Sequence, residues 1–292
     1  MKKIKTAVFP VGGLGTRFLP ATKSMPKEML TVVDKPLIQY AFEEAKNAGI
    51  EQFIFITGRN KTAIEDHFDN AYELESVLNE REKEHLLSLA KDWLPPAGNI
   101  AFIRQQNPLG LGHAVYCAKN FIGDEPFAVI LADEMFLSEG KSLLQNMIEQ
   151  YENTGGNVLG VAEVPQKDVN KYGIVTPSPE YTEGDTIPIC DMVEKPAPEN
   201  APSNISIVGR YILQPQIFDY LSKGKKGQGG EIQLTDAIKA TMNNVDTYGV
   251  KFTGKRIDCG GHRGFLEANI AFALKNPASK EYVEQMLREF LE

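Results

Sequence analysis

A glycine-rich stretch directly after a short apolar run is the feature that most constrains what this chain can form. The run Thr6-Ala7-Val8-Phe9 has the length and character of a buried parallel strand. Three glycines follow at once: Gly12, Gly13 and Gly15. Three cations stand just beyond them: Arg17, Lys23 and Lys27. Exposed backbone N–H groups with nearby cations suit a polyphosphate, so we expect the phosphate end of a nucleotide site here.

Two familiar phosphate loops do not fit this stretch. The dinucleotide fingerprint needs a third glycine where Phe18 stands, and Pro20 and Pro26 preclude an immediate long helix. The Walker loop needs Gly-Lys-Ser/Thr, which this stretch lacks. An ordinary glycine-rich turn with solvated charges therefore stays open as the alternative.

Short apolar runs alternate with helical segments through the first half of the chain. Strands are expected at 6–9, 53–57, 100–104, 127–131 and 157–164, and helices at 37–48, 62–70, 72–92, 113–119 and 141–152. This alternation predicts an α/β fold with a Rossmann-like, mostly parallel sheet flanked by helices. Such sheets bind ligands at the carboxyl ends of their strands. The glycine loop, the loop over 105–112 and Asp133 all follow strand ends, so we expect them at one site.

The character of the sequence changes after Gln166. Several prolines between 165 and 202, with short strand candidates at 173–176 and 187–194, predict a small antiparallel lobe. The stretch KGKKGQGG at 223–230 is expected to be a mobile loop; it is basic and could touch phosphate, but solvation is the favoured explanation. Helices are expected at 234–243, 262–275 and 279–291.

Composition excludes several classes of protein. A net charge of −8 over 292 residues argues against a nucleic-acid surface, and no apolar run approaches the roughly 20 residues of a membrane span. No signal-peptide core precedes the first strand, so a cytoplasmic location is expected. The cysteines are too widely spaced to suggest a disulfide framework: Cys117, Cys190 and Cys259.

An ordered series of motifs resembles the sugar-1-phosphate nucleotidylyltransferases. GGLGTR at 12–17 and PKEML at 26–30 carry the family's signature. Later stretches match in family order: GLGHAV at 110–115, LAD at 131–133, VEKP at 193–196, IVGRY at 207–211, GGEIQLTDAI at 229–238 and DCG at 258–260. Two positions depart from the common pattern, Gly12, which is often alanine, and Glu134, where many relatives carry another residue. Neither departure removes a group that the chemistry needs.

The resemblance implies a nucleotide-diphospho-sugar transferase fold in one domain over 1–292. Residues 1–165 would form the nucleotide-binding core, 166–260 the sugar-binding portion and 261–292 C-terminal helices that could contact another subunit. The motifs are most similar to those of members that form UDP-glucose and pyrophosphate from UTP and glucose 1-phosphate with Mg²⁺. A homodimer or homotetramer, with no nucleic-acid or membrane partner, is also implied.

The resemblance also implies a role for each matched residue. Gly12, Gly13 and Gly15 would contact the nucleotide through their backbone, while Arg17 and Lys27 would act on the triphosphate and the departing pyrophosphate. Gln105 and Gly110 would read the uracil edge, for which an amide offers both donor and acceptor. Gln106 is chemically identical, so only family spacing favours Gln105.

The sugar and metal sites follow in the same way. Asp133 and Asp258 would hold Mg²⁺, whose ligands are oxygens. Asp258 could instead be a turn aspartate before Cys259-Gly260-Gly261. Glu194 would accept sugar hydroxyls, Lys195 would bind the sugar phosphate and Gly173 would let the chain pass close to the ring. Because strand side chains alternate, Glu194 and Lys195 can share a site only near a strand end.

Three other interpretations are compatible with the same residues. A dTTP-dependent glucose-1-phosphate thymidylyltransferase would share the whole mechanism. A catalytically silent regulator would keep the nucleotide-sugar pocket, although Arg17, Lys27, Asp133, Lys195 and Asp258 are all present. A glycosyltransferase would share the α/β pocket and an acidic metal ligand, but it has no need for the glycine-Arg-Lys cluster.

Overall fold

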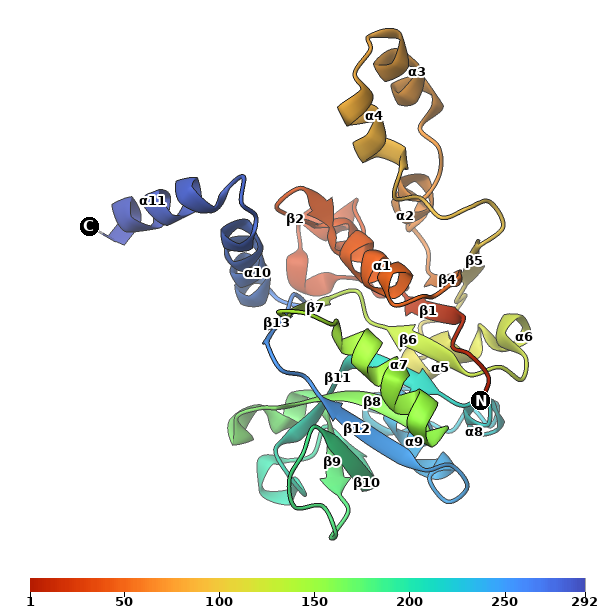
Figure 1. Ribbon diagram of the computed structural model, residues 1–292. Helices are drawn as coiled ribbons and strands as arrows, with labels where there is room; N and C mark the ends of the chain where they lie inside the picture. The colour runs from red at the N-terminus through yellow and green to blue at the C-terminus, as the bar shows by residue number, and fades with distance from the viewer. Residues whose placement is uncertain (292) are drawn as a thin grey trace.

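The structure, a computed structural model, describes residues 1–291, and within them the main sheet has nine strands. Their order across the sheet is β5 (Ile100–Arg104), β4 (Gln52–Thr57), β1 (Thr6–Pro10), β6 (Phe127–Ile130), β11 (Ile205–Leu213), β8 (Asn157–Glu163), β12 (Thr247–Lys251), β10 (Thr186–Glu194) and β9 (Gly173–Pro177). The sheet runs through the centre of the molecule (Figure 1).

Strand directions divide the sheet into two halves. The strands β5, β4, β1 and β6 are parallel, as the alternating pattern predicts. The fully buried β11 then runs antiparallel to both β6 and β8. The antiparallel pair expected after Gln166 is present as β9 and β10. The first part of β10 also pairs antiparallel with β12, where Thr186 lies opposite Val250. The lobe that these strands form is therefore the edge of the same sheet.

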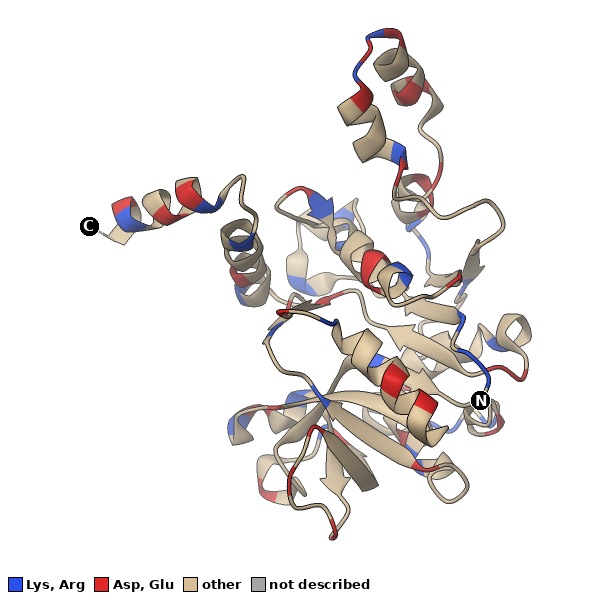
Figure 2. Cartoon of the chain, in the orientation of Figure 1, with Lys and Arg blue, Asp and Glu red and all other residues tan. Residues whose placement is uncertain are grey.

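Helices cover both faces of the sheet because strand side chains alternate. Val8 points into the core under one set of helices and Phe9 into the core under the other. One face is covered by α1 (Leu37–Asn47), α2 (Thr62–His67) and α7 (Leu143–Thr154). The other is covered by α5 (Leu111–Tyr116), α6 (Lys119–Ile122), α8 (Ile217–Leu221) and α9 (Leu234–Thr241). The strands carry little charge, and Lys, Arg, Asp and Glu gather on the helices and loops (Figure 2).

The prediction of a single helix over 72–92 is wrong. The chain forms α3 (Tyr72–Glu80) and α4 (Glu84–Lys91), separated by a turn in which Glu82 has a φ of 55°. A right-handed helix cannot continue through a left-handed residue. Neither helix buries a residue, and together they extend away from the sheet (Figure 1).

The last described helices are α10 (His262–Lys275) and α11 (Lys280–Leu291), and α11 projects to the left of the view, away from the sheet and from α3 and α4 (Figure 1). None of the helices within residues 1–291 has both the length and the apolar character that a membrane crossing requires.

Several short elements surround the carboxyl ends of the strands. The prolines after the glycine loop predict that no long helix forms there, and this is confirmed. The segment forms three turns of 3-10 helix: η1 (Thr16–Phe18), η2 (Ala21–Lys23) and η3 (Lys27–Met29). Two small ribbons follow: β2 (Thr31–Val32) with β3 (Lys35–Pro36), and β7 (Glu134–Leu137) with β13 (Lys255–Asp258). The second ribbon places Asp258 opposite Glu134, directly beside Asp133.

Arg210 on β11 ties the end of β6 to the helix layer. Its side chain is 1% exposed, and its Nε and Nη2 donate to Glu44 Oε2 on α1 at 3.0 and 2.7 Å. Nη1 donates to the carbonyl of Leu131 at 2.9 Å and Nη2 to that of Glu134 at 3.0 Å. A buried guanidinium with this many partners fixes the turn between these two carbonyls, which contains Asp133.

Replacing Arg210 should therefore destabilise the fold. In Arg210→Met, the Glu44 carboxylate loses the guanidinium that it contacts, and we expect the free energy of unfolding to fall by about 3–5 kcal/mol. Urea denaturation followed by circular dichroism measures this loss. Arg104→Met, which removes an exposed guanidinium from β5, is the matched control and should change stability by less than about 0.5 kcal/mol. Equal effects of the two variants would contradict the role given to Arg210.

Candidate active site

Two cavities at the carboxyl ends of the strands meet at Arg17 and Asp133. The first, about 240 Å³, is lined by the glycine loop from Gly13 to Phe18 together with Lys27 and Gly260. The second, also about 240 Å³, is lined by Gly173, Glu194 and Lys195 from β9 and the end of β10, together with Asp258 from β13. Arg17 and Asp133 line both cavities. The structure therefore brings the residues proposed for phosphate, metal and sugar to one place.

The glycine loop lies against the side chain of Lys27. A Cβ built at Gly13 would contact Lys27 Cε, and one built at Gly15 would lie 3.2 Å from Lys27 Cβ. Gly15 also has a φ of 66°, a conformation that favours glycine. Lys23, in contrast, is exposed and lines neither cavity of the described residues, so the structure does not bring it to the site with Lys27.

Lys27 and Asp133 form an ion pair where the two cavities meet. The Nζ of Lys27 lies 2.6 Å from Asp133 Oδ2, and each side chain is about one quarter exposed. Burial disfavours the charged form of both groups, but their mutual attraction outweighs it. The pKa of Lys27 is raised and that of Asp133 is lowered. Both groups are therefore charged at neutral pH.

Gly260 shows how closely three charged groups approach one another. A Cβ built there would lie 2.9 Å from Asp258 Oδ1, 3.2 Å from Arg17 Nη1 and 3.3 Å from Asp133 Oδ2. Asp258 Oδ1 accepts a hydrogen bond from the Gly260 amide, so Asp258 is the turn former of the alternative interpretation. It also faces Asp133, and the Cys259 amide donates to the Asp133 carbonyl at 2.7 Å, which holds the two carboxylates side by side.

The glutamine proposed to read the base is in contact with both glycines proposed to lie beside it. Gln105 is 9% exposed, its Nε2 donates to the Gly110 carbonyl at 3.1 Å, and its Oε1 would meet a Cβ built at Gly12. Its Nε2 also lies 3.0 Å from Nδ1 of His113, the first residue of the helix expected over 113–119. Gln106 is exposed. Burial and contacts thus distinguish Gln105 from Gln106 as the candidate base contact, which their identical chemistry does not.

Residues of the sugar-side cavity meet at a strand end. β10 ends at Glu194, and Lys195 has a φ of 48°, which breaks the alternation and lets both side chains line the same cavity. Glu194 Oε2 accepts a hydrogen bond from the Thr235 hydroxyl at 2.6 Å. A Cβ built at Gly173 would lie 3.0 Å from this hydroxyl and 3.2 Å from the carboxylate, so a larger residue there would press on both groups.

A largely buried ion pair at the edge of this cavity is not predicted from the sequence. Glu134 Oε2 accepts from Arg256 Nε at 2.5 Å, and the Arg256 guanidinium stacks on Tyr172, 4.6 Å from the ring centroid. Burial raises the pKa of Glu134 despite this partner. The two residues are 122 positions apart, and only the ribbon of β7 and β13 brings them together. Arg256 thereby offsets the charge of the acidic residue next to Asp133.

The carboxylates Asp133 and Asp258 are the residues of this site that could hold a metal ion. Within residues 1–291, no group of three or more His, Cys, Asp or Glu side chains is placed to enclose a metal ion. Two carboxylates near one point, beside a cavity lined by cations, instead suit Mg²⁺. This ion keeps water and phosphate oxygens and needs only one or two protein carboxylates.

Comparison with known proteins agrees with this geometry. The family model described as nucleotidyl transferase matches residues 6–274. The UTP–glucose-1-phosphate uridylyltransferase of Staphylococcus haemolyticus is 49% identical over 99% of both chains, and that of Staphylococcus epidermidis is 48% identical over the same share.

Solved structures agree as well. A UTP-bound UGPase from Acinetobacter baumannii is 41% identical, with a TM-score of 0.90, and the alignment covers 98% of this chain and 99% of that one. A UDP-glucose pyrophosphorylase complexed with UDP-glucose is 43% identical, with a TM-score of 0.83 over 94% and 100% of the two chains. The chain therefore belongs to the nucleotidyl transferase family.

Proposed function

We propose that this protein is a UTP–glucose-1-phosphate uridylyltransferase, which forms UDP-glucose and pyrophosphate from UTP and glucose 1-phosphate. The observation that carries the proposal is the meeting of a glycine-lined cavity and a sugar-side cavity at Arg17 and Asp133. A nucleoside triphosphate in the first cavity and a sugar phosphate in the second would present their reacting atoms to each other at that point. Since the proposed substrates are made inside cells, we also place the protein in the cytoplasm.

The reaction needs charge neutralisation and alignment rather than a covalent intermediate. An oxygen of the sugar phosphate forms a bond to the α-phosphorus of UTP while the bond from that phosphorus to the bridging oxygen of pyrophosphate breaks. Arg17 and Lys27 stabilise the negative charge that the departing pyrophosphate gains. Lys195 holds the phosphate of the sugar, and Glu194 and Gly173 position the ring.

Asp133 and Asp258 are the residues that would hold Mg²⁺, and Arg17 lies beside both carboxylates. When bound, this ion neutralises phosphate oxygens and orients the triphosphate. Lys27 pairs with Asp133 Oδ2, so the ion would share this carboxylate with the lysine or leave the ammonium group free to contact the phosphates.

Release of pyrophosphate tests the proposal. Purified protein with Mg²⁺ and glucose 1-phosphate should release pyrophosphate with UTP much faster than with dTTP, CTP, ATP or GTP. Release should stop when the sugar phosphate or the metal is omitted. A preference for dTTP would move the assignment to thymidylyl transfer. A folded protein that binds UDP-glucose but releases nothing with any nucleotide would be a regulator, and either result contradicts the proposal.

The same assay tests the base contact with a matched pair of variants. Gln105→Leu should lower kcat/KM for UTP by about 10- to 100-fold, because one or two hydrogen bonds to the base are lost. Gln106→Leu, next to it but exposed, should leave kcat/KM within about twofold. The reverse pattern would exchange the roles of the two glutamines.

Lys27 is tested by removing its ammonium group. Lys27→Ala should lower kcat by about 10²–10³-fold, as the loss of one preorganised donor does in other enzymes. The exposed Lys23, four positions earlier, provides the control variant Lys23→Ala, which should retain activity. Circular dichroism shows whether both variants fold. Unchanged turnover in a folded Lys27→Ala protein would remove the lysine from the mechanism.

We also propose that the protein is a homodimer or homotetramer in which α11 contacts a second copy. Of the described residues of α11, Val283 alone is buried, while Tyr282, Phe290 and Leu291 are 70%, 82% and 88% exposed. Light scattering should give a mass of twice or four times the chain's 32.4 kDa, and Tyr282→Glu with Phe290→Glu should lower it. A monomer at every protein concentration would contradict this assembly.

A further inference from the structure

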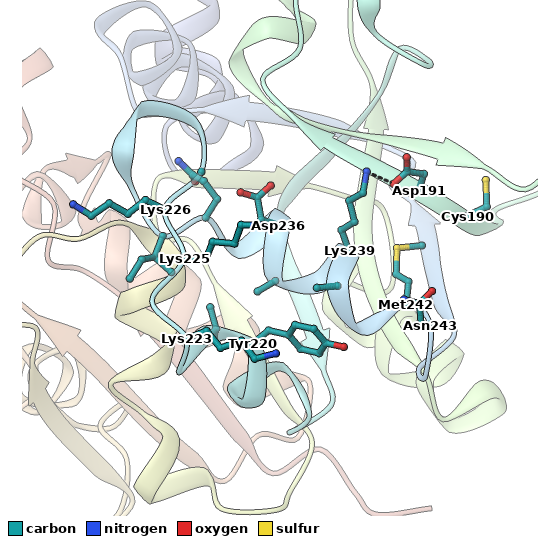
Figure 3. A pocket seen from close by; sticks show the side chains of 16 residues that line it. Cys190, Asp191, Tyr220, Lys223, Lys225, Lys226, Asp236, Lys239, Met242 and Asn243 are labelled. Atoms are coloured by element: carbon teal, nitrogen blue, oxygen red, sulfur yellow. Dashed lines mark ion pairs between the residues drawn. The ribbon is translucent and has the colours of Figure 1, made fainter.

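A third and larger cavity lies outside the site described above, on the other side of α9. Its volume is about 590 Å³, and its walls come from the segment after α8, the outer side of α9 and the middle of β10 (Figure 3). Gln233 lines both this cavity and the sugar-side cavity. The two cavities therefore share a wall made of the turn that leads into α9.

The lining combines an apolar floor with a cationic rim. Leu221, Ile232, Ala237 and Met242 supply apolar surface, and Tyr220 adds a ring. Four lysines stand against two aspartates, in a chain whose overall charge is negative: Lys223, Lys225, Lys226 and Lys239 against Asp191 and Asp236. A cavity of this size with a few charged groups at its edge is typical of a site for a small molecule.

The four lysines are not equally engaged. Lys239 pairs with Asp191 at 2.6 Å, and Lys223 lies over the ring of Tyr220, 4.6 Å from its centroid (Figure 3). Within residues 1–291, Lys225 and Lys226 form no ion pair. Two ammonium groups thus remain available to an anion in the cavity.

The loop that carries these lysines is held against α9. The Gly227 amide donates to the Glu231 carbonyl at 2.8 Å, and Gln233 Nε2 donates to the Gln228 carbonyl at 2.9 Å. Gly227 packs so closely against Asp236 that a Cβ there would overlap its carboxylate. These contacts hold the basic loop at the rim of the cavity. A loop whose lysines were only solvated would not need them.

The same turn continues into both substrate subsites. The Ile232 amide donates to the Leu109 carbonyl at 2.8 Å and the Gly112 amide to the Ile232 carbonyl at 2.9 Å, which brace the loop of Gln105 and Gly110. Three residues later, Thr235 donates to Glu194. A ligand that holds the basic loop therefore acts on the segment that supports the base and sugar contacts.

We propose that this cavity binds a small organic phosphate, with its ring on the apolar floor and its phosphate on Lys225 and Lys226, and that its occupancy alters substrate binding through residues 227–235. The site is separate from the substrate cavities and does not require that their proposed substrates be correct. Because the bound phosphate stabilises the turn as it stands in the structure, it strengthens the binding of the sugar phosphate. Coupling of this kind is a shift in affinity between two sites.

Pyridoxal 5′-phosphate is a suitable probe, since it carries a ring, a phosphate and an aldehyde. A lysine amine adds to the aldehyde and loses water to give an imine, and borohydride reduces the imine to a stable secondary amine. With UDP-glucose present to protect the substrate site, Lys225 or Lys226 should be labelled faster than the exposed Lys3 and Lys83, as measured by peptide mass spectrometry. Pyridoxal, which lacks the phosphate, should label them at least about tenfold more slowly, and AMP should compete.

Equal labelling of Lys225, Lys226, Lys3 and Lys83, with no effect of the phosphate, would show that the rim lysines are only solvated and would overturn the site. For the coupling, the protein labelled in this way and freed of UDP-glucose should show a KM for glucose 1-phosphate at least about threefold lower than the unlabelled protein. Lys225→Gln with Lys226→Gln should show normal basal activity and no change after the same treatment. An unchanged or higher KM in the labelled wild-type protein would overturn the coupling.

Discussion

The buried guanidinium of Arg210 is the interaction on which the site depends. Its hydrogen bonds to α1 and to the carbonyls of Leu131 and Glu134 fix the turn that leaves β6 at the centre of the sheet. Asp133 stands in that turn and faces Lys27 from the glycine loop. A flexible turn would let this carboxylate relax toward solvent, because a carboxylate is better solvated in water than in a partly buried cleft. The interior of the sheet thus determines where the charged groups at its edge can be.

Charge balance is the second constraint. A chain with a net charge of −8 is proposed to gather two highly charged anions at one point, which requires cations held close to carboxylates. Lys27 pairs with Asp133, Arg256 pairs with Glu134, and Arg17 lies near Asp133 and Asp258. Each carboxylate has a cation nearby. The pairs keep the partly buried charges compensated and leave the cations in place for phosphate.

Much of this arrangement follows from sequence because its signals are local. Apolar runs, glycines and prolines indicate the parallel strands, the loop after β1 and its short turns. The convergence of the glycine loop, the 105–112 loop and Asp133 follows from the rule that ligands bind at strand ends. The ribbon of β7 and β13 cannot be predicted from the sequence in this way, since Lys255–Asp258 is a short, charged strand without apolar alternation. The pairing of Arg256 with Glu134 depends on that ribbon, and the preference for Gln105 over Gln106 depends on burial, which adjacent identical residues do not reveal. The break at Glu82 lies in a charged segment that lacks a glycine or proline signal.

The most direct test of the account is the position of the metal in a crystal of the protein with UDP-glucose and Mn²⁺, which replaces Mg²⁺ and gives an anomalous signal. We expect one strong peak within coordination distance of both Asp133 and Asp258, next to the α-phosphate, with the uracil against Gln105. A peak bound by neither carboxylate, or a uracil ring away from Gln105, would contradict the central claim that these strand ends form one nucleotidyl-transfer site.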